Sequence, residues 1–331
     1  MTRVGERARQ QAYQPHHSGK VFTVSNRPTQ LSGLLVAMPA PFDEDEQFMP
    51  GTFKRLLRDL VDAGMHGFLV NGTMGAQPLL CLSAFEQITE AASEALKGSG
   101  CPLMIGCGDT SHQKTLEKMR IAEQYDIDYL TLTSPFYFQY TDEELSRYFR
   151  RLADATDKDI LLYDNPDCTH NKLSLALVEE LSQVPNIRGI KCSAFDLHYI
   201  RMLRERLAAR GDFSLICGVP HFMDLLMVDG VQAFMDGLWA MTPRLATEML
   251  QAGRAGDSEG ARRAVFKMVS LVDRMVELGL WGAYTAGMNI LGYEGQYGVA
   301  PLGKPDSETV RRMRQVLAEE DLAPHIPATL P

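Results

Sequence analysis

The sequence lacks every pattern that would place its cysteines in a metal site or a disulfide framework. Its six cysteines are scattered along the chain, with no Cys-x-x-Cys motif and no Cys/His cluster. Zinc sites and disulfide scaffolds both depend on such spacing. We therefore expect reduced thiols and no metal site.

Long apolar runs and an excess of positive charge are also missing. No uninterrupted apolar segment approaches the ~20 residues that a membrane-spanning helix needs, and the N-terminus lacks the apolar core of a signal peptide. The formal net charge is −9, whereas nucleic-acid-binding proteins usually display a basic face. These absences predict a cytoplasmic protein with no membrane and no nucleic-acid partner.

The composition that remains is that of an ordinary globular protein, with 45% hydrophobic and 23% charged residues in a chain of 331. Residues 1–30 are polar and rich in Gln and His, which predicts a partly disordered N-terminal extension. Barrels of alternating strands and helices commonly form one domain of about 250 residues, so a single large core fits this length.

Residues 31–255 repeat one unit, in which a short apolar segment is followed by an amphipathic helix pattern. Capping boxes are predicted at Ser83 with Glu86 and at Thr141 with Glu144, each at the start of a helix. The eight apolar segments are 34–38, 68–70, 103–105, 129–132, 160–163, 187–191, 213–217 and 233–235.

Eight such units indicate the α/β class and a closed (β/α)8 barrel, the TIM barrel, better than an open sheet. The alternative, a doubly wound sheet, predicts a Gly-x-Gly-x-x-Gly turn after the first strand, and the sequence has none there. From about residue 256 the strand pattern stops. Apolar residues at helical spacing over 261–276 and a further segment at 306–317 predict a C-terminal helical extension, a bundle over 256–331 packed on the barrel.

In such a barrel the functional residues lie at the C-terminal ends of the strands. Lys191 ends the sixth apolar segment, where burial disfavours a charged ammonium and leaves the free amine available as a nucleophile. A lysine in this position can also simply extend into solvent. Tyr163 could shuttle protons or pack in the barrel mouth, and the glycine-flanked Thr73 could bind a carboxylate or form an ordinary turn.

Four short motifs stand at successive strand ends. They are Gly-Thr-Met-Gly-Ala at 72–76, Pro-Phe-Tyr at 135–137, Tyr-Asp-Asn-Pro at 163–166 and Gly-Ile-Lys at 189–191. In their order and spacing the sequence, from about residue 31 to about residue 317, resembles the dihydrodipicolinate synthase / N-acetylneuraminate lyase family of pyruvate-dependent class I aldolases. Each motif alone is weak, and it is the combination that carries the resemblance.

The resemblance implies that Lys191 forms an imine, or Schiff base, with pyruvate or another 2-oxo acid and that no cofactor is needed. A carbon–carbon bond to an aldehyde or within a sugar acid would then be made or cleaved. Tyr163 would be the acid/base, and Thr73 would link it to Tyr137 in a proton relay. Because family members place the Tyr137-like residue across a subunit interface, a homodimer or homotetramer is implied.

The sequence departs from the family pattern at residues that would bind substrate. Met74, after Gly72, stands where a second threonine is usual, so one hydroxyl for the substrate carboxylate is lost while the backbone N–H groups remain. Ala76 replaces the usual glutamate. Cys168 occupies the place of an arginine that holds a second substrate carboxylate in dihydrodipicolinate synthases, which argues against an amino-acid semialdehyde as substrate.

The loops after the last two strands, 218–221 and 236–239, are bulkier and more apolar than usual, which predicts a smaller or less polar acceptor, or a sugar acid packed against Trp239. Asp236 could contact substrate or serve as a turn aspartate. Alternatives to a dihydrodipicolinate synthase-like lyase are a 2-oxo-3-deoxy sugar acid dehydratase or aldolase using the same imine and a catalytically silent relative that binds a 2-oxo acid. A metal-dependent aldolase is disfavoured, because the strand ends carry only scattered Asp164, His170 and Asp236 as ligands.

Overall fold

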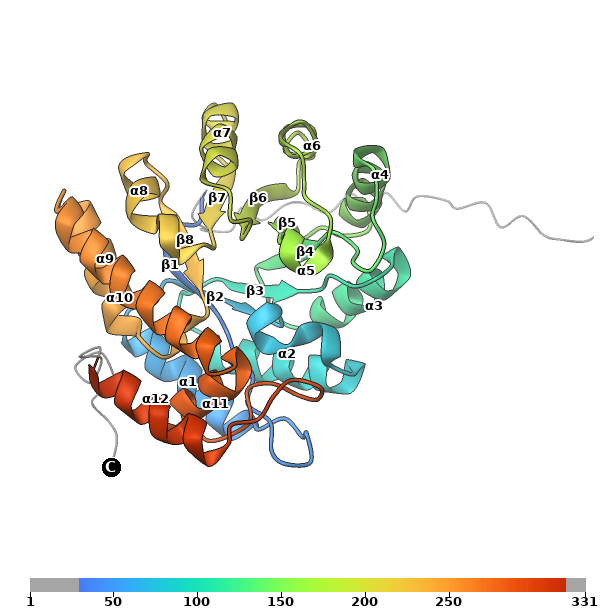
Figure 1. Cartoon of the computed structure of the whole chain (residues 1–331). Helices are drawn as coiled ribbons and strands as arrows, with labels where there is room; N and C mark the ends of the chain where they lie inside the picture. The colour runs from blue at the N-terminus through green and yellow to red at the C-terminus, as the bar shows by residue number, and fades with distance from the viewer. Residues whose placement is uncertain (1–29, 320–331) are drawn as a thin grey trace, which may run out of the picture.

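Eight parallel strands close into a barrel in chain order, with β8 hydrogen-bonded to β1 (Figure 1). This computed structural model describes residues 30–319, so nearly all of the predicted N-terminal extension lies outside the described residues. The predicted α/β fold, a (β/α)8 barrel, is confirmed. The strands are β1 (Gly33–Ala37), β2 (Gly67–Val70), β3 (Leu103–Gly106), β4 (Tyr129–Thr133), β5 (Asp159–Asp164), β6 (Ile187–Cys192), β7 (Ser214–Cys217) and β8 (Ala233–Asp236).

Helices follow the strands and form a ring around the barrel (Figure 1). The predicted capping box at Thr141 and Glu144 is confirmed, because each side chain bonds the backbone N–H of the other residue. The one predicted at Ser83 is wrong: α2 begins at Leu82, with Cys81 as its N-cap. The ring comprises α1 (Pro50–Asp62), α2 (Leu82–Leu96), α3 (His112–Ala122), α4 (Asp142–Ala153), α6 (Leu175–Leu181), α7 (Leu197–Leu207), α8 (Met223–Val228) and α9 (Pro243–Arg254). The short helix α5 (Pro166–Thr169) follows β5 and lies inside this ring (Figure 1).

The strands separate two hydrophobic cores because their side chains alternate between the two faces. On β1, Leu35 and Ala37 point into the barrel, whereas Leu34 and Val36 pack against the surrounding helices. The inner core also contains Leu31, Leu69, Met104, Tyr129, Leu161, Ile216, Ala233 and Met235. Residues at the next inward positions, towards the C-terminal ends, therefore line the mouth of the barrel.

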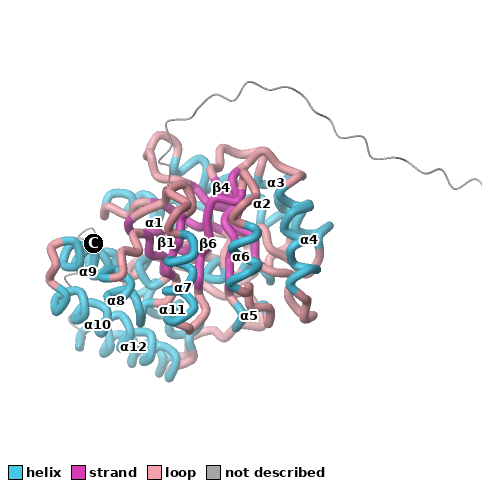
Figure 2. Tube along the Cα trace, turned by 90° about the horizontal axis from the view of Figure 1, so that it is seen from above, coloured by secondary structure: helices cyan, strands magenta, loops and turns pink. Residues whose placement is uncertain are grey.

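Three further helices, α10 (Ser258–Glu277), α11 (Leu280–Ile290) and α12 (Ser307–Glu319), lie together on one side of the barrel (Figure 1, orange to red). In the side view α12 lies towards the same end of the barrel as α5 (Figure 2). The helical patterns read from the sequence correspond to α10 and α12, but α11 was not predicted. None of the described helices is both long enough and apolar enough to cross a lipid bilayer.

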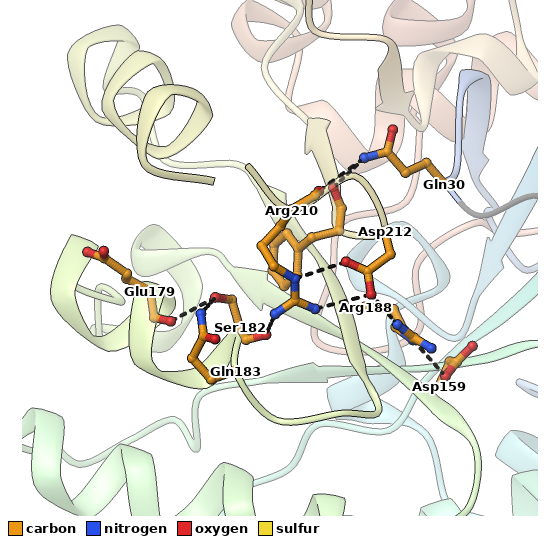
Figure 3. Close-up of polar contacts among 9 residues, drawn as sticks. Gln30, Asp159, Glu179, Ser182, Gln183, Arg188, Arg210 and Asp212 are labelled. Carbon is orange, nitrogen blue, oxygen red and sulfur yellow. Dashed lines mark hydrogen bonds and ion pairs between the residues drawn. The ribbon is translucent and has the colours of Figure 1, made fainter. Parts of the chain in front are cut away.

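Charged side chains tie neighbouring strands together at the N-terminal end of the barrel (Figure 3). Arg188, on β6, lies 3.5 Å from Asp159 on β5 and also pairs with Asp212, just before β7. Arg210 forms a second ion pair with Asp212, at 2.9 Å. In TIM barrels this end serves stability while the opposite end carries function, so the site is expected at the C-terminal ends of the strands.

Candidate functional site

Lys191 and Tyr163 lie side by side in the mouth of the barrel. They are register partners on β6 and β5, and both side chains are 5% exposed. Ile190 and Cys192 belong to the outer core, so the alternation along β6 turns Lys191 inward. The Lys191 Nζ atom lies 4.0 Å from the centroid of the Tyr163 ring. The structure thus brings together the predicted imine-forming residue and the predicted acid/base.

Space for the Lys191 side chain depends on Gly218, the residue after β7. A Cβ atom at this position would lie 2.9 Å from Cε of Lys191 and 2.5 Å from Oγ of Ser193. Both distances are shorter than a van der Waals contact. The absence of a side chain at Gly218 therefore lets the lysine follow its path across the end of β7.

Three polar side chains form a cluster beside the lysine, which we call the hydroxyl cluster: Thr73, Tyr163 and Asn165. The hydroxyls of Thr73 and Tyr163 lie 3.3 Å apart. The Asn165 amide donates to the Tyr163 hydroxyl at 3.2 Å and to the Thr73 hydroxyl at 3.4 Å. The sequence analysis did not assign Asn165 a role, although it belongs to the motif that contains Tyr163.

The segment that carries Thr73 is a short 3-10 turn, η1 (Thr73–Gly75), which Gly72 precedes. Asn71, directly before it, has a left-handed backbone with φ 53° and is held because its amide donates to two groups of α2. The half-buried Met74 side chain crosses to the end of β8, where a Cβ on Gly237 would lie 2.3 Å from the Cγ atom of Met74. Met74 therefore covers the mouth with a thioether where a hydroxyl was expected in the family.

Tyr137 does not complete the hydroxyl cluster within the chain. It is 80% exposed, has a left-handed backbone with φ 87°, and packs edge-on against Phe138 with ring centroids 5.1 Å apart. No hydrogen bond joins it to Thr73 within residues 30–319. The predicted relay from Tyr163 through Thr73 is therefore present in its first step only.

A cavity of about 150 Å³ adjoins the hydroxyl cluster on the side of β2, β3 and β4. Thr73, Tyr163 and Asn165 form part of its wall, and Cys168 of α5 lies at its edge. Loss of solvation raises the pKa of the Cys168 thiol, which is therefore uncharged at neutral pH. Where an arginine was expected in a synthase of this kind, the site presents a neutral group.

Asp236 ends β8 and is half-buried, with its carboxylate accepting a hydrogen bond from the backbone N–H of Leu238 at 2.7 Å. Burial raises the pKa of Asp236 to about 6, and the nearby charge of Lys191 acts in the opposite direction. The carboxyl group can thus change its charge near pH 6, close to Lys191. The predicted contact between Asp236 and substrate stays a prediction.

The prediction that Trp239 packs against substrate is corrected by the structure. Trp239 is fully buried, with 0% of its surface exposed, in the short turn η4 (Leu238–Ala240). Its ring N–H points to the Sδ atom of Met268 on α10, at 3.2 Å. The indole therefore joins the C-terminal helices to the barrel and has no surface for a ligand.

Within the described part of the chain, no three His, Cys, Asp or Glu side chains are grouped so that they could hold a metal ion. The chemistry that the site offers instead is that of one buried amine, three neutral polar groups and one carboxyl group. An amine next to hydroxyl proton donors suits nucleophilic catalysis on a carbonyl compound.

Comparison with known proteins agrees with this geometry. The model of the dihydrodipicolinate synthetase family matches residues 30–320. An uncharacterized DapA-like lyase of Pyrococcus horikoshii is 27% identical over 243 residues, covering 73% of this chain and 83% of the relative. A 4-hydroxy-tetrahydrodipicolinate synthase of Acidiphilium cryptum is 25% identical over 285 residues, covering 86% and 97%. The crystal structure of YagE from E. coli K12, in complex with pyruvate, has a TM-score of 0.82 at 22% identity, covering 88% and 99%.

Proposed function

Since the chain belongs to the dihydrodipicolinate synthetase family, we propose that it is a lyase of the aldolase type that uses an imine on Lys191 to join a 2-oxo acid, such as pyruvate, to an aldehyde or to separate the two. The observation that carries the proposal is the buried Lys191 amine, 4.0 Å from the ring of Tyr163 and beside the hydroxyl cluster. The named relatives support the reaction class, because they are DapA-like lyases and a synthase of the same family.

The first step is imine formation. The amine of Lys191 adds to the ketone carbon of the 2-oxo acid, a proton passes from nitrogen to oxygen, and loss of water leaves the protonated imine. Tyr163 is placed to donate a proton to the departing hydroxide, because its hydroxyl accepts a hydrogen bond from Asn165 and keeps its own proton available. Thr73, at 3.3 Å, can replace that proton.

The second step uses the imine as an electron sink. The Tyr163 oxygen, which gave up its proton in the first step, takes a proton from the carbon next to the imine. This gives an enamine, which attacks the aldehyde carbon and forms the new carbon–carbon bond. The aldehyde oxygen takes a proton from Tyr163, and water then releases the product from Lys191. The reverse sequence cleaves the same bond and releases pyruvate, so this one site supports both directions.

The carboxylate of the 2-oxo acid would bind at the turn η1, through the backbone N–H groups of Thr73 and Met74. The thioether of Met74 cannot replace the hydroxyl that the family usually supplies, so binding of the carboxylate is weaker by about 1 kcal/mol, the value of one neutral hydrogen bond. The reaction needs no metal and no cofactor under this proposal, since the protonated imine that Lys191 forms with the 2-oxo acid serves as the electron sink.

A second copy of the chain would complete the site with its Tyr137. The tyrosine is 80% exposed at the mouth and held in a left-handed conformation that costs on the order of 1 kcal/mol or more. A contact between the Tyr137 side chain and a second subunit would compensate for this cost. A homodimer, or a homotetramer built from two such dimers, would thus be the active form.

Borohydride reduction in the presence of pyruvate tests the imine. We expect irreversible inactivation and a mass increase, equal to one reduced pyruvyl group, on the peptide that contains Lys191. The variant K172A is a matched control, because Lys172 also lies at this end of the barrel but is paired with Asp164 at 3.4 Å. Loss of labelling in K191A alone supports the proposal, and labelling elsewhere contradicts it.

Release of free pyruvate then separates an aldolase from a dehydratase that only expels water, and binding without either product indicates a silent relative.

A further inference from the structure

Two glycines, one at the end of β3 and one in the loop after it, line the cavity beside the hydroxyl cluster and add no side chain to it. At Gly106, the last residue of β3, a Cβ would lie 2.1 Å from the carbonyl oxygen of Asn71. At Gly108 a Cβ would lie 2.0 Å from the hydroxyl of Thr133. No side chain from the end of β3 therefore enters the space between β2 and β4.

The base of the cavity comes from inward-facing residues of neighbouring strands. Leu69 of β2 belongs to the inner core, and Thr131 and Thr133 of β4 also line the cavity. Leu130 and Leu132, which alternate with them, pack against the helices. The cavity is thus part of the barrel mouth, and Tyr163 lies both in its wall and beside Lys191.

The side chains that line this cavity, all of them among the described residues, include no Lys, Arg, His, Asp or Glu. The polar ones are hydroxyls and amides, and Cys168 at the edge carries a thiol whose pKa is raised. Under the proposed function the backbone N–H groups of η1 already bind the carboxylate of the 2-oxo acid. A second carboxylate in this cavity would have neither those donors nor a cationic partner, and moving it there from water costs several kcal/mol. An uncharged ligand has no such cost.

We propose that this cavity binds the part of the aldehyde that does not react, and that the aldehyde is therefore a small uncharged one rather than an aldehyde that bears a carboxylate. This inference rests on the proposed aldolase function of Lys191. A cavity near 150 Å³ holds a ligand of about the size of benzene, so the part of the aldehyde that does not react has no more than about six non-hydrogen atoms. The aldehyde oxygen lies at the Tyr163 hydroxyl and receives its proton there, while the carbon chain points to Thr131.

The test compares two acceptors that share a carbon chain and differ in a terminal carboxylate, butanal and succinic semialdehyde, each with pyruvate as donor. We expect the wild-type enzyme to use butanal with a kcat/KM at least about tenfold higher. Glyceraldehyde, which is uncharged but hydroxylated, is expected to be accepted as well. Equal or better use of succinic semialdehyde overturns the inference, and so does turnover of neither uncharged aldehyde by an enzyme that forms the imine.

Two variants test whether the aldehyde binds in this cavity. T131L fills the cavity and should lower kcat/KM for butanal about tenfold, while labelling of Lys191 by pyruvate and borohydride stays unchanged. T247L is its control, because Thr247 lies on α9 outside the barrel and its hydroxyl donates only within that helix. If T131L does not fold, C168R answers the same question from the exposed edge of the cavity, since an added guanidinium should raise the use of succinic semialdehyde relative to butanal.

These outcomes separate the two proposals. Absence of labelling on Lys191 in the wild-type enzyme removes the proposed function and the inference with it. Normal labelling together with a T131L variant and a C168R variant that both keep the wild-type ratio of the two acceptors removes only the inference, because the acceptor then binds elsewhere in the mouth.

Discussion

The amide of Asn165 donates a hydrogen bond to the hydroxyl of Tyr163 across 3.2 Å, from two residues further along the same segment. The same amide lies 3.4 Å from the hydroxyl of Thr73. A phenol oxygen that accepts from an amide is held in place and has its proton free for another acceptor. Asn165 therefore orients the proposed acid/base towards the substrate that Lys191 would hold.

Replacing Tyr163 with phenylalanine should lower kcat by about 10² to 10⁴-fold, because the ring remains beside Lys191 while the proton donor is lost. Y125F is the control, since Tyr125 is a tyrosine on the outer surface that donates to Glu86. Steady-state kinetics and circular dichroism of both variants provide the measurement. Wild-type kcat in Y163F would show that another group transfers the proton.

Replacing Asn165 with alanine should lower kcat by about tenfold and leave KM for pyruvate nearly unchanged, because the amide orients Tyr163 without holding the lysine. N186A serves as the comparison. Asn186 lies at the other end of the barrel, where its amide bonds backbone carbonyls such as that of Ala153 at 3.0 Å. A purely structural role for Asn165 would instead lower stability with no change in kcat.

Mixing two inactive variants should restore activity if Tyr137 serves a neighbouring subunit. K191A lacks the amine and Y137F lacks the proposed donated hydroxyl, so a mixed dimer contains one complete site. Co-refolded subunits should recover roughly a quarter of the wild-type activity, the fraction expected for random pairing. Recovery should be absent when Y137F is mixed with a K191A/Y137F double variant, because that mixture contains the amine but no Tyr137. No recovery in the first mixture would place Tyr137 in its own subunit's site or outside the mechanism.

The stability of the protein should depend on the charge of Asp236. Its pKa is raised from 3.8 to about 6 by burial, so the folded chain binds more protons than the unfolded chain between these values. The free energy of unfolding consequently falls as pH rises from about 4 to about 6, and stays lower above that. The variant D236N should not show this fall. The difference in the free energy of unfolding between D236N and wild type should therefore increase by up to about 3 kcal/mol from pH 4 to pH 7.

Urea denaturation of wild type and D236N at the two pH values measures the difference. D157N is the control, because Asp157 is an exposed residue in the loop before β5. A difference between wild type and D236N that does not change with pH would mean that the carboxyl group titrates alike in the folded and unfolded chains.

Two buried threonines should respond to valine in opposite directions. Thr131 is 2% exposed, and its hydroxyl has no partner among the protein groups of residues 30–319. T131V should therefore raise the free energy of unfolding by about 1 kcal/mol. Thr115 is fully buried and bonds the hydroxyl of Tyr148 at 2.8 Å and the N–H of Asp109 at 3.1 Å, so T115V should lower it by about 1 to 3 kcal/mol. Thermal or chemical denaturation of both variants measures these changes. Equal changes in the free energy of unfolding would contradict the statement that only the Thr115 hydroxyl has hydrogen-bond partners.

Periodicity in the sequence was enough to predict the barrel and the positions of Lys191 and Tyr163. Apolar segments of strand length indicate strands that are buried on both faces. In a barrel helices cover one face and the interior takes the other, and the missing Gly-x-Gly-x-x-Gly turn argued against an open sheet. The cap at Thr141 was equally readable, because both of its hydrogen bonds are local. At Ser83 the same pattern failed, since α2 begins earlier, with Cys81 as its N-cap.

Helix α11 escaped prediction because its glycines and small residues weaken the helical signal. Seven of its residues, including Gly282 and Gly287, are buried, and a Cβ on Gly287 would lie 2.6 Å from the Cε atom of Met241. Such a helix forms because close packing against its neighbours stabilises it. No pattern within the segment itself records that packing.

The sequence by itself determined which faces of the strands are apolar, and hence that a lysine and a tyrosine stand at neighbouring strand ends. Only the tertiary structure decided that Trp239 is buried against Met268, that Asn165 holds the Tyr163 hydroxyl, and that an uncharged cavity opens beside it. The reason is that periodicity along a chain specifies the direction of a side chain, whereas its partners come from segments far away in sequence, brought together by closure of the barrel.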